Sequence, residues 1–135
     1  MTQSITRLNP PTLPDAGAIG YSQISVVEAG RLAFVSGQVA LRPGGDPVPS
    51  GLAEQAGIVA ANAKAALDAL GATPRDIAIA RCFVTDLTPE RLDLAFSPVL
   101  EMFDGAQPSV TGVGVSALAD PDFQIELELT VRLPD

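Results

Sequence analysis

One stretch near the C-terminus constrains the fold more than any other. Apolar and polar residues alternate there from position 123 to position 132: Phe123, Ile125, Leu127, Leu129 and Val131 are apolar, while Gln124, Glu126, Glu128, Thr130 and Arg132 are polar. A period of two is typical of a β-strand, whose side chains point alternately to opposite faces of a sheet. The strand therefore needs a hydrophobic layer on one of its faces.

Two segments can supply that layer as helices. Apolar residues recur at helical spacing through residues 52–70, with Ser50 expected to cap the start and Gly71 to mark the end. Residues 88–103 predict a second helix, which Pro98 is expected to kink. Because two helices cover only one face of a sheet, we expect further copies of the chain to cover the other face.

Shorter apolar runs complete the predicted order. Four other segments predict strands: residues 24–29, 31–36, 77–84 and 110–117. The first two are expected to form a hairpin that turns near Gly30, and residues 1–20, which contain several prolines, to form an irregular arm. Residues 1–135 are thus expected to form a single α+β domain, a two-layer sandwich with the order β-β-α-β-α-β-β.

Charge and residue usage argue against several classes of function. The chain has 8 basic and 16 acidic residues, and its lysines and arginines are scattered, so no nucleic-acid partner is expected. It contains no histidine, the commonest metal ligand and general base, so no metal or cofactor is expected. Cys82 is the single cysteine, and no apolar run is long enough to span a bilayer. We expect a cytoplasmic protein with a small-molecule partner and no membrane partner.

Candidate ligand contacts gather where one apolar strand meets a glycine. The strand ends in Ser36, Gly37 and Gln38, which present a hydroxyl group and an amide at the mouth of a turn. Gly37 is expected to allow a backbone conformation that a residue with a Cβ would resist. Without a histidine to activate it, Ser36 is expected to bind a ligand or the turn rather than to act as a nucleophile.

Several segments, taken together, resemble the Rid superfamily (YjgF/RidA, reactive intermediate imine deaminases). The matching segments are Tyr21-Ser22-Gln23, Phe34-Val35-Ser36-Gly37-Gln38, Phe83-Val84-Thr85-Asp86-Leu87, Gln107-Pro108-Ser109 and Ile125-Glu126-Leu127-Glu128, together with the helix of residues 52–70. The resemblance implies the fold that a small class of chorismate mutases also uses. It further implies a homotrimer around a central sheet barrel, with small-molecule clefts between neighbouring subunits.

The resemblance also implies which residues line the cleft. It assigns substrate binding to Tyr21, Ser36, Gly37, Val110, Thr111 and Gly112. It assigns the handling of a catalytic water to Glu126. In the imine deaminases an arginine at the position of Val110 grips the substrate carboxylate, and a valine cannot do this. Val110 therefore argues against the hydrolytic deamination of 2-iminoacids, although Arg81 is a candidate replacement.

These residues leave three functions open. The first is an enzyme of the enamine/imine deaminase type that uses Glu126 and a water molecule. The second is a non-catalytic ligand-binding or regulatory trimer that has kept the cleft, and the third is a chaperone-like trimer. Each candidate residue also has an ordinary interpretation: Glu126 as a solvated or interface carboxylate, Arg81 as half of an interface ion pair, and Phe96 as part of the helix core.

Overall fold

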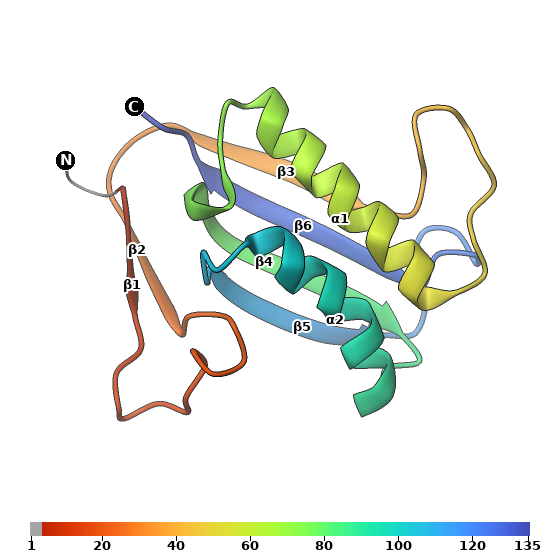
Figure 1. The fold of residues 1–135 in the computed structure, drawn as a ribbon, viewed down its shortest axis with the longest axis horizontal. Coiled ribbons are helices and arrows are strands. Elements are labelled where there is room, and N and C mark those ends of the chain that lie inside the picture. The colour runs from red at the N-terminus through yellow and green to blue at the C-terminus, as the bar shows by residue number, and fades with distance from the viewer. Residues whose placement is uncertain (1–3) are drawn as a thin grey trace.

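The fold combines a main sheet, a short two-stranded ribbon and two helices. The computed structural model describes residues 4–135, and the elements within this range are β1 (Ile5–Leu8), β2 (Ile24–Val27), β3 (Leu32–Gln38), α1 (Leu52–Ala69), the 3-10 turn η1 (Pro74–Asp76), β4 (Ile77–Thr85), α2 (Pro89–Phe103), β5 (Ser109–Val115) and β6 (Ile125–Arg132). Figure 1 shows both helices crossing the main sheet. The predicted α+β class is confirmed.

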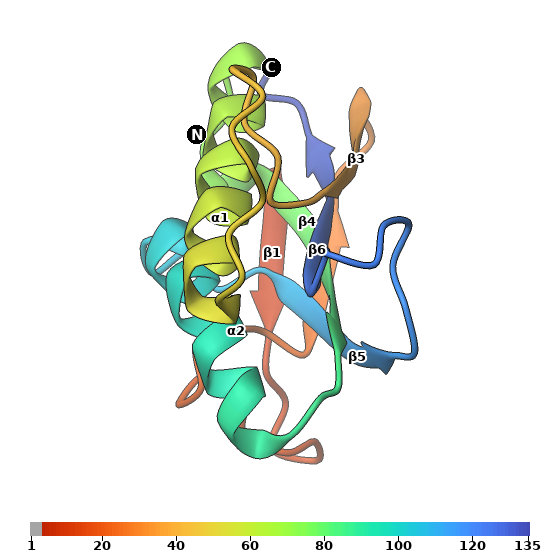
Figure 2. The ribbon, with the colours of Figure 1, turned by 90° about the vertical axis from the view of Figure 1, so that its right-hand side faces the viewer.

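The main sheet has four strands in the order β3-β6-β4-β5. β6 pairs antiparallel with both of its neighbours, whereas β4 and β5 run parallel. The parallel pair is possible because α2 carries the chain back across the sheet between the two strands. Figure 2 shows α1 and α2 together on one face of the sheet, so the layers are those of the predicted sandwich.

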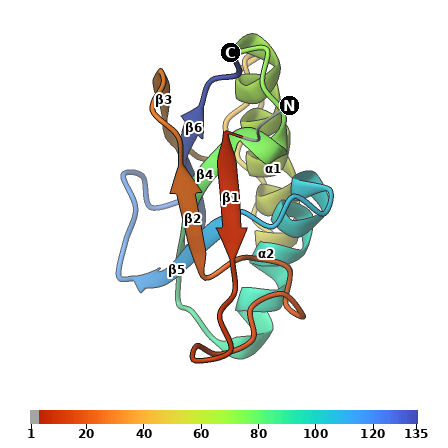
Figure 3. The same cartoon turned by 90° about the vertical axis from the view of Figure 1, so that its left-hand side faces the viewer.

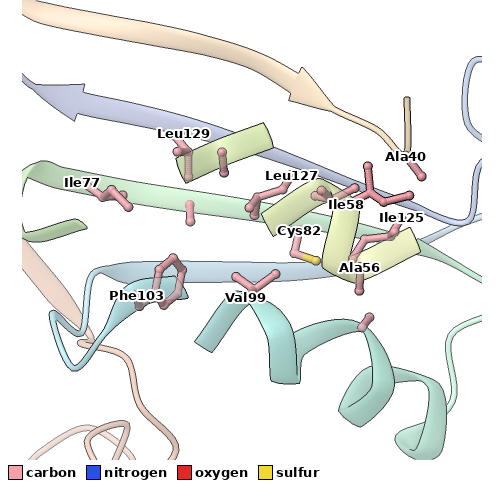
Figure 4. Close-up of a cluster of buried hydrophobic side chains, with 14 of the residues drawn as sticks. Ala40, Ala56, Ile58, Ile77, Cys82, Val99, Phe103, Ile125, Leu127 and Leu129 are labelled. Carbon is pink, nitrogen blue, oxygen red and sulfur yellow. The ribbon is translucent and has the colours of Figure 1, made fainter. Parts of the chain in front are cut away.

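The core lies between the sheet and the helices. The alternation that the sequence showed in β6 is confirmed, because Ile125, Leu127, Leu129 and Val131 are all buried under the helices. Figure 4 shows several of these side chains meeting residues of α1 and α2. The buried positions of α1 include several alanines, which let this helix pack closely on the sheet. Burial of each large aliphatic side chain contributes about 1.5–3 kcal/mol.

The helix ends agree in part with the sequence. Gly71 follows α1 with a positive φ of 65°, as a residue that ends a helix often does. Thr88 caps α2, since its Oγ1 accepts a hydrogen bond of 3.1 Å from the backbone N–H of Arg91. Ser50 does not cap α1: the capping residue is Gly51, which makes no side-chain hydrogen bond. The prediction of a Ser50 cap is therefore wrong by one residue.

Residues 5–8 form a strand, so the prediction of an irregular arm is wrong there. β1 pairs antiparallel with β2, with Ile5 opposite Val27 and Leu8 opposite Ile24. A four-residue run followed closely by prolines has too little local preference for a strand, and its partner lies in another part of the chain. Figure 3 shows this ribbon beside one end of the main sheet.

The predicted hairpin between β2 and β3 is also wrong. β2 pairs with β1, and β3 pairs with β6. Between the two strands lies Arg132, a buried residue whose guanidinium donates hydrogen bonds of 3.2 Å and 2.8 Å to the carbonyl oxygens of Glu28 and Ala29. A Cβ on Gly30 would overlap this guanidinium, so Gly30 makes room for a long-range contact instead of a tight turn.

Candidate functional site

An apolar cavity of about 280 Å³ lies between α2, β5 and the segment before β2. Its walls come from these three elements and from β4 and the loop that follows it: Ile19, Tyr21, Cys82, Leu87, Leu92, Phe96, Val110 and Gly112. Three of the predicted site residues, Tyr21, Val110 and Gly112, are therefore brought together although they lie far apart in the sequence. Cavities of this size and composition are typical of small-molecule sites.

The cavity follows from the pairing of β5 with β4. Val110 lies opposite Ala80 and Gly112 opposite Cys82, so both face the helical side of the sheet. A Cβ on Gly112 would have no atom within 4 Å, which means that this position opens onto free space. The lack of a side chain at Gly112 therefore leaves part of the cavity empty.

Helix α2 supplies the wall opposite β5. Leu92 and Phe96 are one helical turn apart and both line the cavity. The ring of Phe96 is held edge-to-face against the buried Phe103, with 6.2 Å between the ring centroids and 78° between the ring planes. Phe96 thus packs on the core, as predicted, and at the same time forms a wall of the cavity.

Two residues with polar side-chain groups, Tyr21 and Cys82, line this cavity. The segment of Tyr21 is tied to the start of β5, since Ser22 N–H donates a 3.1 Å hydrogen bond to the carbonyl oxygen of Pro108. Burial raises the pKa of the Cys82 thiol to about 11, so this group is neutral at physiological pH.

A second group of predicted site residues gathers where β3 meets β6. The register of the two strands shifts between Val35 and Gln38, so Ser36 and Gly37 sit at an irregularity of the ladder. The side chain of Glu126 lies directly against Gly37: a Cβ there would lie 2.7 Å from Glu126 Cγ and closer still to the carboxyl group. Ser36 is exposed. A carboxylate and a hydroxyl group can therefore reach one surface.

The two groups lie on opposite faces of the sheet. Glu126 alternates with the buried Ile125 and Leu127, so it points away from the helices, whereas Val110 and Gly112 point toward them. Thr111 belongs to neither group, because it alternates with Val110 and Gly112 and is exposed on the face away from the helices. Within one protomer, Glu126 cannot reach a ligand in the apolar cavity.

Arg81 also lies away from the cavity. It is paired in the sheet with Thr111 on one side and Glu128 on the other, and its Nη1 lies 3.5 Å from Oε1 of Glu128. This ion pair is solvent-exposed, so it contributes little to stability. Within one chain, Arg81 is therefore not placed to take over the role of the arginine that the imine deaminases have at the position of Val110.

Five of the cavity residues were not predicted as site residues: Ile19, Cys82, Leu87, Leu92 and Phe96. Leu92 and Phe96 follow helical spacing, which is the same for a helix that covers a core and for one that walls a cavity. A usable signal was Gly112, a residue without a side chain within a strand, which leaves space beside α2.

Other kinds of site receive no support from the described residues. Among residues 4–135 no group of three or more His, Cys, Asp or Glu side chains is arranged to hold a metal ion. No helix in the same range has both the length and the apolar character required to cross a membrane.

Comparison with known proteins agrees with this geometry. The sequence profile of the Endoribonuclease L-PSP family matches residues 14–133. YyfB from Yersinia pestis, a protein of unknown function of the conserved Rid family, superposes with a TM-score of 0.90 at 32% identity, over 96% of this chain and 99% of that one. The chain belongs to the Rid family.

Two further relatives are similar in sequence. The RutC family protein YjgH from Escherichia coli is 35% identical over 112 residues, which is 82% of each chain. Protein DfrA from Myxococcus xanthus is 38% identical over 107 residues, 75% of this chain and 77% of that one. The resemblance drawn from the sequence segments is confirmed, and this Rid chain spans most of the length of its relatives.

Proposed function

We propose that this chain forms a cytoplasmic homotrimer that binds a small metabolite in clefts between subunits and promotes the hydrolysis of an imine or enamine. The observation that carries the proposal is the convergence of Tyr21, Val110 and Gly112 on one cavity. Those positions were assigned to the substrate from the family resemblance alone, and they line a space large enough for a small molecule.

The split between the two groups of residues supports a site shared by two copies. Ser36, Gly37 and Glu126 lie on β3 and β6, on the face away from the helices, whereas the cavity opens beside β5, at the far edge of the sheet. Joining the β3 side of one copy to the β5 side of another brings the carboxylate to the cavity. Phe34, which is 76% exposed on β3, is an apolar residue that such an interface would cover.

Glu126 is the residue that would act on water in this site. In imine hydrolysis the oxygen of water bonds to the imine carbon while the carboxylate accepts a proton from that water. This proton passes to the nitrogen, which gives a carbinolamine. The hydroxyl proton of the carbinolamine is then transferred to the nitrogen as the carbon–nitrogen bond breaks, so that ammonia leaves and a carbonyl compound remains. No redox partner is needed. With Val110 in place of an arginine, we expect 2-iminoacids to be poor substrates.

The name of the matching family refers to an endoribonuclease, but the proposal for this chain does not include RNA cleavage. The chain has a net charge of −8 and no histidine, so it offers neither the basic surface that RNA phosphates require nor the usual general base.

Ammonia release tests the proposal. The substrates are 2-aminoacrylate generated in situ and imines released in situ from simple primary amines by a flavin amine oxidase. We expect the protein to accelerate ammonia release from the second group, and Glu126→Gln to reduce this by about 100-fold or more while the protein stays folded. Brisk turnover of 2-aminoacrylate would contradict the argument from Val110. Ligand binding without any turnover would contradict the enzymatic proposal and favour a non-catalytic ligand-binding trimer. Analytical ultracentrifugation tests the oligomeric state separately, as a trimer of 13.9 kDa chains.

A further inference from the structure

We propose that the cavity beside α2 and β5 selects an uncharged ligand with an aromatic or branched aliphatic group, and rejects carboxylates and phosphates. This inference rests on the proposed function for the place of binding and adds the chemical class of the ligand. It follows from four properties of the cavity: its lining, the engagement of the nearby arginines, the burial of Cys82 and its size.

The lining contains no charged side chain. Leu92 and Phe96 form the α2 wall, Val110 and Gly112 form the β5 wall, and Ile19 and Leu87 extend the surface. Removing a carboxylate from water into such surroundings without a partner carries a large unfavourable free energy. An apolar group placed in the same surroundings gains about 25 cal/mol for each Å² that it buries.

The arginines on the flanking elements are engaged elsewhere. Arg91 of α2 donates from Nε and Nη2 to the carbonyl oxygen of Thr85, at 3.2 Å and 3.0 Å, and from Nη2 to Oε1 of Gln124 at 3.2 Å. Arg81 of β4 points to the other face of the sheet, where it pairs with Glu128. Neither guanidinium is placed to neutralise an anion in the cavity.

The pKa of the Cys82 thiol reflects the same apolar environment. Its side chain is 2% exposed at the base of the cavity, and burial raises the pKa of its thiol to about 11. Surroundings that keep a thiol neutral in this way also disfavour the ionised form of a bound acid.

The size of the cavity suits a ring with a short substituent. An engineered apolar cavity of about 150 Å³ is large enough to bind benzene, and this one measures about 280 Å³. Around its mouth, Ile19, Leu87 and Leu92 are 57%, 38% and 40% exposed, so they offer apolar surface that a ligand would cover. Tyr21 lines the cavity as well, and its hydroxyl is a group that can donate a hydrogen bond to a neutral polar ligand.

A pair of probes that differ in charge tests this inference. Phenylacetamide and phenylacetate have nearly the same shape, and their dissociation constants are measured by isothermal titration with the full chain. We expect phenylacetamide to bind at least about tenfold more tightly, a difference of about 1.4 kcal/mol. Equal binding, tighter binding of phenylacetate, or no binding of either probe would overturn the inference.

Substitutions then locate the binding. Val110→Arg is expected to reverse the preference, because a guanidinium pairs with the carboxylate of phenylacetate. Gly112→Leu is expected to abolish binding by filling the cavity. Gly44→Leu is its matched control, since a Cβ on Gly44 would likewise have no atom within 4 Å, but Gly44 lies in the loop before α1. If circular dichroism shows that Val110→Arg does not fold, the comparison of Gly112→Leu with Gly44→Leu decides the test. Unchanged binding by Gly112→Leu would overturn the inference.

Binding and turnover separate this inference from the proposed function. A preference for the neutral probe without imine hydrolysis would leave the ligand class standing and contradict the enzyme. Imine hydrolysis without that preference would support the enzyme and contradict the ligand class.

Discussion

The side chain of Glu126 occupies the space in which a Cβ on Gly37 would lie. Gly37 belongs to the irregular part of the β3–β6 ladder, and Glu126 projects from β6 on the face away from the helices. The glycine therefore determines where the proposed catalytic carboxylate sits. Its role is steric: it leaves room for a neighbouring side chain.

This relationship predicts the effect of Gly37→Ala. The new methyl group displaces Glu126, so we expect imine hydrolysis to fall by about tenfold or more and the free energy of unfolding to fall by about 1 kcal/mol. Adding Glu126→Ala to Gly37→Ala removes the overlap and should restore the unfolding free energy without restoring activity. Urea denaturation of the two single variants and the double variant measures the coupling. Strict additivity of the two changes would contradict the contact, and Gly44→Ala serves as the control.

Arg132 predicts a second effect, on stability. Its guanidinium donates to the carbonyl oxygens of Glu28, Ala29 and Leu133, and the side chain is only 3% exposed. Arg132→Met leaves these acceptors without their donor, so we expect the free energy of unfolding to fall by about 2–4 kcal/mol. Arg31→Met, at an exposed neighbouring position, should change it by less than about 0.5 kcal/mol. Similar midpoints for both variants in chemical denaturation would count against this role of Arg132.

Gln55 predicts a third effect. Its buried amide donates to the carbonyl oxygens of Pro49 and Asp122, at 2.8 Å each, and accepts a 2.9 Å hydrogen bond from the N–H of Gln124. Gln55→Leu keeps the side-chain volume but leaves these backbone groups without a hydrogen-bond partner. We therefore expect the free energy of unfolding, measured by thermal or chemical denaturation, to fall by about 2–4 kcal/mol. The exposed neighbour Glu54 gives the control, Glu54→Leu, and an equally small effect of both changes would refute the bridging role of Gln55.

Cys82 predicts a dependence of stability on pH. Burial raises the pKa of its thiol from 9.0 to about 11, so the folded chain holds a proton that the unfolded chain loses between these values. The stabilisation is complete below pH 9.0 and is lost as the pH rises toward about 11, by about 2–3 kcal/mol in total. Cys82→Ala should remove this part of the alkaline loss. Equal slopes of unfolding free energy against pH for both proteins would contradict the prediction.

The elements predicted well are those in which local pattern and burial agree. In β6 every second residue from Ile125 to Val131 is buried, so the alternation and the structure report the same fact. The cap of α2 by Thr88 is equally local, because it involves Arg91 three residues later.

The Ser50 cap missed by one residue, whereas the predictions of the hairpin and of the irregular arm failed at contacts between distant residues. The hairpin at Gly30 was reasonable from its immediate neighbours, but Arg132, about a hundred residues later, occupies the space beside it. Phe96 shows the same limit within the site. Its helical spacing is consistent with core packing, and only the position of β5 makes it a wall of the cavity as well.

The sequence by itself determined the α+β class, most of the strands and helices, the Rid resemblance and the identity of the candidate residues, because these depend on local alternation, helix ends and short segments in order. Tertiary structure alone decided that Val110 and Gly112 face the helices, on the side of the sheet opposite to Glu126. The physical reason is that the face of a residue depends on strand pairing and sheet order. These are settled by contacts that join parts of the chain far apart in sequence.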